Sequence, residues 1–201
     1  MIINATIADI WRPSEEIKAF LYDISLIFCG SIFIALSAWL AVGWLAVGWP
    51  VPFTMQTFAV LMIGALFGAN RASAAVLLYL FEGAAGLPVF SHGQAGISVF
   101  MGPTGGYLIG FLIAAYITGL LAQRGWDRRF ISTAFAMLIG NIFIYTFGIL
   151  RLTVLVGFDS ALKTGLYPFI AGAIIKIILA AGLLPTGWKI INNFGFNNDR
   201  H

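Results

Sequence analysis

The chain has 201 residues, of which 60% are hydrophobic and only 9% are charged. Soluble globular domains carry about 25% charged residues, whereas between Leu26 and Gln123 the only charged side chains are Arg71 and Glu82. So few charges cannot cover a water-exposed surface, and the composition predicts an all-α integral membrane protein. The net charge of +3 comes from scattered single residues, which argues against a nucleic-acid-binding surface.

Six apolar segments are predicted to be membrane-spanning helices, because about 20 residues at 1.5 Å each cross the hydrocarbon core. In chain order they cover residues 19–46, 54–67, 72–85, 104–122, 130–150 and 161–191. The second and third are short for full spans. The chain is thereby divided into an N-terminal segment (1–18), a six-helix membrane domain (19–191) and a C-terminal tail (192–201). The N-terminal segment lacks the pattern of a cleavable signal peptide.

Lys and Arg near the span ends predict the orientation in the membrane. With the N-terminus in the cytoplasm, the inner segments hold Arg12, Lys18, Arg71, Arg124, Arg128, Arg129, Lys189 and Arg200. The outer segments then hold only Arg151 and Lys163. Both termini are therefore predicted to be cytoplasmic. The inner connections (68–71 and 123–129) are short and the outer ones (86–102 and 150–161) longer, so the ligand is expected from outside.

A glycine-rich run, VFMGPTGGYLIGF, occupies residues 99–111. A phosphate-binding loop needs a lysine and then Ser or Thr after its last glycine, and neither is present here. Pro103 and Thr104 instead predict a helix start, with Thr104 as the N-cap. Gly105, Gly106 and Gly110 would then allow close approach of another helix or of a ligand.

Neutral polar residues gather near the predicted outer face. Residues 86–100, GLPVFSHGQAGISVF, are too glycine-rich for a lipid-exposed span, and such backbone is tolerated where it faces protein or a cavity. Ser91, Gln94 and Ser98 could serve such a cavity, or the segment is a plain outer loop. Gln56, at the outer start of the second span, bonds either a neighbouring helix or a ligand.

Lys176 is the most informative single residue. It lies 13 positions before Lys189, about 20 Å along a helix, which places it at membrane depth. A lysine there is costly and usually faces a cavity on a substrate path, unless it extends to the interface. Its ammonium group needs an acceptor, and Glu82 near the outer end of the third span is a candidate.

Catalytic and metal sites are not indicated by the sequence. The two histidines are His92 and His201, and no His, Cys and carboxylate cluster has metal-ligand spacing. Neither an enzyme activity nor a cofactor is therefore expected.

The order VPFTMQT, LLYLFEGAAGLPVF, GPTGGYLIGF, GNIFIYTFG and YPFIAGAIIK resembles the BioY family over about residues 28–191. These proteins are the biotin-specific S components of energy-coupling-factor (ECF) vitamin transporters. The resemblance implies a six-helix S-component fold in a prokaryotic cell membrane, with biotin bound under the first and third outer loops. It further implies that a separate T component and two cytoplasmic ATPases energise transport, or that the chain works alone. Formation of a homo-oligomer is also possible under this resemblance.

Three alternatives stay open at this point. The first is an S component for another small vitamin or a biotin precursor. The others are a structural membrane protein and an intramembrane enzyme.

The resemblance also implies a biotin site. The family's polar loop residue, often Asn, is Gln94 here, and the Asp of its sixth-helix pattern is replaced by Ala173, whereas its Lys is kept as Lys176. Lys176 would serve either the carboxylate or the ureido oxygen. The expected substrate-binding residues are Lys176, Gln94, Gln56, Ser91, Gly105, Tyr107, Phe90, Phe53, Tyr145, Glu82 and Asp159.

The resemblance finally implies docking of the first helix on the T component. Small residues spaced four apart form the family's docking face. Here that face would be Ser31 and Ala35, or Ser37 and Ala41.

Overall fold

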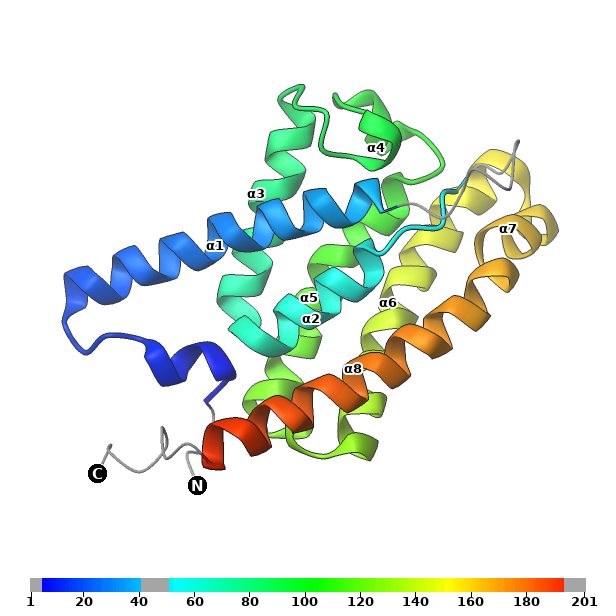
Figure 1. Cartoon of the computed structure of the whole chain (residues 1–201). Helices are drawn as coiled ribbons and strands as arrows, with labels where there is room; N and C mark the ends of the chain where they lie inside the picture. Colours follow the sequence, from blue (N-terminus) through cyan, green and yellow to red (C-terminus); the bar gives the residue numbers. More distant parts are fainter. Residues whose placement is uncertain (1–4, 41–50, 194–201) are drawn as a thin grey trace.

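The computed structural model of the chain describes residues 5–40 and 51–193 (Figure 1). Its elements are η1 (Ile7–Trp11), α1 (Glu16–Trp39), α2 (Gln56–Phe67), α3 (Ala69–Ala84), η2 (Ser91–Gly93), α4 (Ser98–Met101), α5 (Gly105–Gln123), η3 (Trp126–Arg128), α6 (Phe130–Val156), α7 (Phe158–Gly165) and α8 (Tyr167–Asn193). The six predicted spans correspond to α1, α2, α3, α5, α6 and α8, which confirms the all-α membrane fold.

The helices differ in how well they could cross a bilayer alone. Three of them, α1, α5 and α6, and the combined segment Phe158–Asn193 are long and apolar enough to cross a membrane. Helix α2 has 12 residues and α3 has 16, or about 18 and 24 Å of length. Most of α2 is buried among its neighbours, so protein rather than lipid surrounds the greater part of this short helix.

Helix α5 is central and packs against α2, α3 and α6, while α1 covers α3 and α8 covers α6 (Figure 1). The glycines of α5 make these contacts close. A Cβ added at Gly110 would lie 2.9 Å from Cα of Ile144 on α6, and one at Gly106 would overlap the backbone of Phe147. The structure therefore shows helix contact, one of the two roles expected for this glycine run.

Several predicted boundaries are wrong. The inner turn at 68–71 is a single residue, Gly68, whose φ of 83° favours glycine. The expected outer loop at 150–161 is helical instead, because α6 continues to Val156 and only Gly157, with a φ of 82°, separates it from α7. Helix α8 accordingly begins at Tyr167, not at residue 161.

Two further helix ends differ from expectation. Helix α1 ends at Trp39, whereas the sequence predicted a span reaching residue 46; residues 41–46 lie outside the described part of the chain. Thr104 stands at the N-terminal end of α5, but its side chain makes no capping hydrogen bond there.

An ion-pair cluster ties three elements together at one end of the bundle. Arg71 at the start of α3 contacts Asp9 of η1 and Asp23 of α1, both at 2.7 Å. Arg12 contacts the same Asp23 at 2.8 Å. Because η1, α1 and α3 each contribute a residue, the cluster fixes the N-terminal segment against the bundle.

A second polar contact at this end joins the α5–α6 turn to α8. Trp188 of α8 donates its indole N–H to Asp127 of η3 at 2.5 Å, and the guanidinium of Arg128 lies 4.6 Å from the Trp188 ring centroid. Asp127 is buried, which raises its pKa to about 6.

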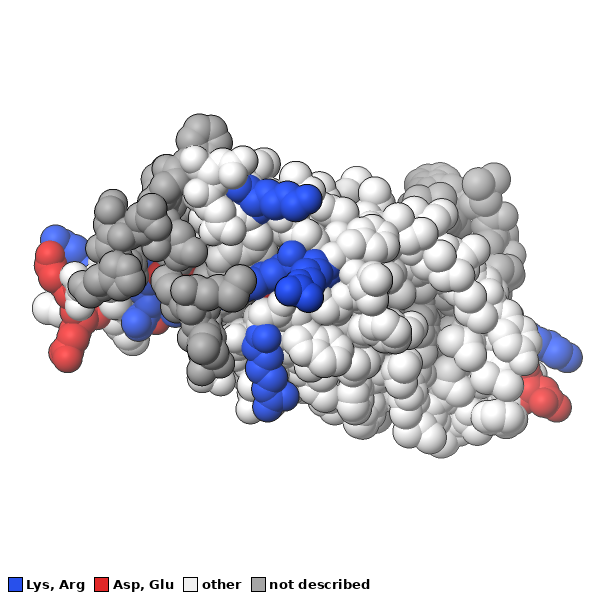
Figure 2. All heavy atoms as spheres, turned by 90° about the horizontal axis from the view of Figure 1, so that it is seen from below, with Lys and Arg blue, Asp and Glu red and all other residues white. Residues whose placement is uncertain are grey.

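The two ends of the bundle differ in charge. Figure 2 shows basic side chains grouped on the underside of the molecule, and the exposed ones on the α5–α6 turn and the end of α8 are Arg124, Arg129 and Lys189. The N-terminal η1 and the end of α8 lie at this end, whereas α7 lies at the opposite one (Figure 1). This arrangement agrees with an even number of spans and with the predicted cytoplasmic end; we call the opposite end the outer end.

Candidate ligand-binding site

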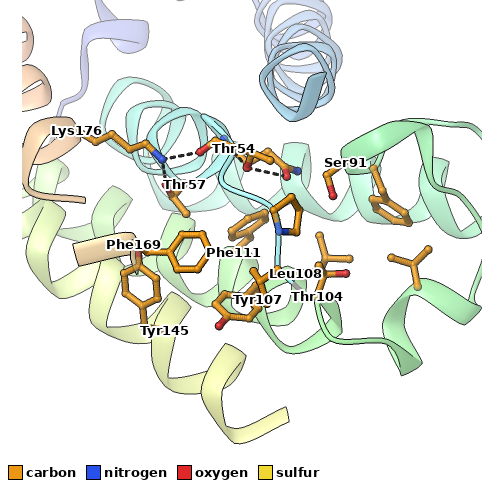
Figure 3. Close-up of a pocket in the computed structure, with 15 residues that line it drawn as sticks. Thr54, Thr57, Ser91, Thr104, Tyr107, Leu108, Phe111, Tyr145, Phe169 and Lys176 are labelled. Atoms are coloured by element: carbon orange, nitrogen blue, oxygen red, sulfur yellow. Dashed lines mark hydrogen bonds between the residues drawn. The ribbon is translucent and has the colours of Figure 1, made fainter. Parts of the chain in front are cut away.

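A narrow pocket lies at the outer end, where the 51–55 segment and the 85–97 loop meet α2, α5, α6 and α8 (Figure 3). Its cavity volume is about 50 Å³, so a bicyclic ligand could enter only if lining side chains moved. The lining residues are Val51, Pro52, Thr54, Gln56, Thr57, Phe90, Ser91, Val99, Thr104, Tyr107, Leu108, Phe111, Tyr145, Phe169 and Lys176.

Lys176 reaches this pocket from α8 and is 9% exposed. Its ammonium donates to the backbone oxygen of Thr54 at 2.5 Å and to the hydroxyl of Thr57 at 3.0 Å. The ammonium also lies 4.7 Å from the ring centroid of Phe53. Among the described residues, no carboxylate comes within ion-pair distance of Lys176. The site therefore holds a buried positive charge whose acceptors are neutral, which favours an anionic ligand.

Helix α8 also packs against the 51–55 segment and holds it in place. Gly172 lies one helical turn before Lys176, and a Cβ added there would overlap the ring of Phe53. Phe53 in turn stacks on Phe169 of the same helix, with ring centroids 5.7 Å apart. The glycine and the lysine thus hold the segment at two points one turn apart.

A chain of hydrogen bonds continues from the 51–55 segment to the 85–97 loop. The hydroxyl of Thr54 donates to the side-chain oxygen of Gln56 at 3.1 Å, and the amide nitrogen of Gln56 donates to the hydroxyl of Tyr79 at 2.6 Å. The Tyr79 hydroxyl then donates to the backbone oxygen of Val89 at 3.3 Å. Together with Lys176, this chain connects both outer segments across α2, α3 and α8.

Aromatic side chains form the apolar walls. Tyr145 lies between Tyr107 and Phe169, at centroid distances of 6.4 and 6.5 Å. The hydroxyl of Tyr107 is engaged elsewhere, since it donates to the backbone oxygen of Gly165 at 2.8 Å. The walls therefore offer mainly ring surface to a ligand.

An outer vestibule of about 360 Å³ adjoins the pocket. It is lined by Pro52, Ser91, His92, Gln94, Ser98, Val99, Gly102, Pro103 and Thr104. Four of these residues, Pro52, Ser91, Val99 and Thr104, also line the inner pocket. The vestibule and the pocket therefore adjoin at these four residues.

The structure brings most of the predicted site residues together. Lys176, Gln56, Ser91, Phe90, Tyr107 and Tyr145 line the pocket. Phe53 lies against Lys176, and Gln94 lines the vestibule.

Three predicted residues lie elsewhere. Gly105 packs against the backbone of Phe100, and Asp159 is exposed on α7. Glu82 accepts a hydrogen bond of 2.5 Å from Ser31 on α1, so the pairing of Glu82 with Lys176 that the sequence suggested is not formed.

Ala173, which stands where the family pattern has Asp, lines a different feature. It faces an apolar groove between α6 and α8, together with residues such as Ile142, Ile170 and Ile174. Ala173 is absent from the residues that line the pocket around Lys176.

Sequence reasoning missed Thr54, Phe111 and Phe169 as parts of the site. Thr54 binds Lys176 through its backbone oxygen, for which a residue type carries no signal. Phe111 lies four positions after Tyr107, and this spacing on one helix face could have identified it.

The predicted docking face of the first helix needs correction. Ser31 and Ser37 are 0% and 4% exposed, because this side of α1 packs on α3. At neighbouring Gly30, an added Cβ would lie 2.8 Å from Cβ of Ala75. Ala35 is half-buried, and Ala41 lies outside the described residues. Ser31 and Ser37 therefore serve contact within the chain, not an external surface.

These features define a multi-pass membrane protein with a narrow, aromatic-walled pocket and a buried lysine near its outer end. The BioY family model matches residues 12–193. The chain belongs to the BioY family.

Individual relatives support the same assignment. The chain is 39% identical over 141 residues to a biotin transporter BioY of Rhizobium etli, covering 66% of this chain and 75% of that protein. It is 36% identical over 149 residues to the biotin transporter BioY of Thermotoga maritima, covering 74% and 85%. A crystal structure of the S-component for biotin from an ECF-type ABC transporter has a TM-score of 0.69 and 25% identity, covering 88% of this chain and 95% of that one.

Proposed function

We propose that this chain is a biotin-binding S component that mediates biotin uptake through the pocket at its outer end. The observation that carries the proposal is Lys176, a buried ammonium with neutral acceptors at one end of an aromatic-walled pocket. The biotin transporters among its relatives support the choice of ligand.

Each part of biotin has a chemical counterpart in the pocket. The carboxylate pairs with the ammonium of Lys176, which releases that group from the Thr54 backbone. The ureido group, which offers one carbonyl oxygen and two N–H groups, pairs with the amide of Gln56 and the hydroxyl of Ser91. The fused rings and the aliphatic tail pack on Tyr107, Tyr145 and neighbouring rings.

Transport is energised by a separate module in this proposal. The proposal assigns ATP hydrolysis to other subunits, in line with the glycine-rich run at residues 99–111, which lacks the lysine of a phosphate-binding loop. A transmembrane T component and two cytoplasmic ATPases would drive uptake. Since Ser31 and Ser37 are buried, the T component would dock on the exposed apolar face of α1. This face carries Phe28, Ile32 and Leu36.

Equilibrium binding of radiolabelled biotin to the purified chain in lipid nanodiscs tests the proposal. We expect saturable binding, with unlabelled biotin competing at least tenfold better than biotinamide, which lacks the negative charge. Equal competition by both compounds would contradict pairing of the carboxylate with Lys176. Absence of binding by the folded protein would overturn the proposed function.

A further inference from the structure

Tyr79 of α3 does not line the ligand pocket but contacts two residues that do, Gln56 and Phe90. Its side chain is 0% exposed and is not among the lining residues of the pocket. Its hydroxyl nevertheless contacts the amide of Gln56, which does line the pocket, at 2.6 Å. An edge-on contact with Phe90, at a centroid distance of 5.4 Å, holds the Tyr79 ring in place.

The direction of these hydrogen bonds is set by the number of protons available. A tyrosine hydroxyl has one proton, and Tyr79 donates it to the backbone oxygen of Val89. Towards Gln56 the hydroxyl can therefore only accept, so it faces the amide nitrogen and not the amide oxygen. At the other end of the same amide, the hydroxyl of Thr54 donates to the oxygen. The Thr54 hydroxyl could also accept, so of the two neighbours it is Tyr79, with its proton given to Val89, that specifies the orientation of the Gln56 amide.

This orientation determines what Gln56 offers to a ligand. One of its two N–H groups bonds to Tyr79, which leaves the second as a donor. Such a donor suits a carbonyl oxygen and does not suit another N–H group. Without Tyr79, the amide could reverse and present its oxygen instead.

We propose that Tyr79 is a positioning residue that sets the hydrogen-bond polarity of Gln56 and thereby favours ligands with a ureido oxygen. The inference deepens the proposed function and rests on it, because the ureido group of biotin is the ligand group concerned. Tyr79 acts at a distance from the ligand and makes no contact with it.

Iminobiotin provides the test, because its cyclic guanidine group is protonated at neutral pH and offers only N–H donors where biotin has the ureido oxygen. We expect the wild-type chain to prefer biotin to iminobiotin. In Tyr79→Phe, biotin affinity should fall about tenfold, while iminobiotin affinity should change less than about twofold. The ratio of biotin affinity to iminobiotin affinity should therefore fall about tenfold. A Tyr79→Phe variant that weakens both ligands equally would overturn the inference.

Tyr22→Phe is the matched control. Tyr22 also donates its hydroxyl to a backbone oxygen, that of Ala8 at 2.9 Å, but it lies at the opposite end of the bundle. The control should keep both affinities. Thermal unfolding of both variants checks that their folds remain comparable.

A double-mutant cycle distinguishes positioning from a merely structural role. In a Gln56→Ala background, Tyr79→Phe should no longer change biotin affinity, because the amide that it orients is gone. A tenfold loss that persists there would overturn the inference while leaving biotin binding established. If Tyr79→Phe does not fold, Thr54→Val tests the other end of the amide. Tyr79 still faces the amide nitrogen in this variant, so the preference for biotin over iminobiotin should be kept, and loss of that preference would overturn the inference. Failure of wild type to bind biotin would instead overturn the proposed function, and this inference with it.

Discussion

At the cytoplasmic end of the bundle, Arg71 has two carboxylate partners, whereas at the outer end Lys176 has only neutral oxygen atoms as acceptors. Both side chains are largely buried, so both lose hydration energy. Burial of a charge without an opposite charge costs several kcal/mol, and groups kept under that cost usually serve function. We therefore expect the paired charges to stabilise the fold and the ammonium of Lys176 to serve a ligand.

The largest expected effect is on affinity, at the outer end. Lys176→Met removes the positive charge but keeps a long apolar side chain. Biotin affinity should fall at least a hundredfold, about 3 kcal/mol, because the carboxylate loses its buried partner. The midpoint of thermal unfolding should stay equal or rise, since an unneutralised buried charge is removed. Labelled-biotin binding and thermal melts measure the two quantities.

Lys163→Met on exposed α7 is the control for this change and should alter neither quantity. If Lys176→Met keeps biotin affinity within threefold of wild type, the ammonium of Lys176 does not pair with the biotin carboxylate.

The opposite behaviour is expected at the cytoplasmic end. Arg71→Met leaves Asp9 and Asp23 without their guanidinium partner, which should lower the free energy of unfolding by about 2 kcal/mol. The thermal midpoint should drop by about 5 °C, while biotin affinity is unchanged. Exposed Arg124→Met serves as the control. A large loss of affinity at unchanged stability would show that this end also takes part in binding.

A smaller effect on biotin affinity is expected when Phe90 of the 85–97 loop is displaced. A Cβ added at Gly83 of α3 would overlap the ring of Phe90, which lines the pocket. In Gly83→Ala the ring must shift, and we expect biotin affinity to fall about tenfold. Gly182→Ala on α8 is the matched control, because an added Cβ there meets nothing within 4 Å. Equal binding by both variants would show that the position of Phe90 is unimportant.

The smallest expected effect concerns pH and Asp127. Burial raises the pKa of this carboxyl to about 6 from its ordinary value of 3.8. The folded state therefore takes up a proton before the unfolded state does, and stability should rise as the pH falls through about 6. Between about pH 7.5 and 5.5, the gain is about 1 kcal/mol. Asp127→Asn should remove this part of the pH dependence, as followed by thermal unfolding in buffered detergent; an unchanged profile would contradict it.

The sequence was sufficient to predict the six helical spans and the position of Lys176 at a buried cavity. Long apolar runs between clusters of basic residues predict helices and sidedness directly, and a lysine at membrane depth stands out in such a run. The ends of the spans were less predictable. Residues 151–156 include Arg151 and Thr153 but continue α6, because the helix ends only where Gly157 adopts a positive φ.

Contacts between particular pairs of residues were the hardest feature to predict. The small residues Ser31 and Ser37 suit contact with a partner and contact with α3 equally well, and only the packing shows that α3 covers them. The acceptor of Lys176 is a backbone oxygen, which every residue possesses. Glu82 was the more obvious acceptor by charge, but its hydrogen bond goes to Ser31 on α1.

A structure of the chain with bound biotin in a lipid nanodisc would test directly whether Lys176 pairs with the carboxylate of the ligand. We predict a carboxylate oxygen about 3 Å from the Lys176 ammonium and the ureido group beside Gln56. Biotin in the apolar groove between α6 and α8, or in the pocket with Lys176 still bonded only to Thr54 and Thr57, would contradict it.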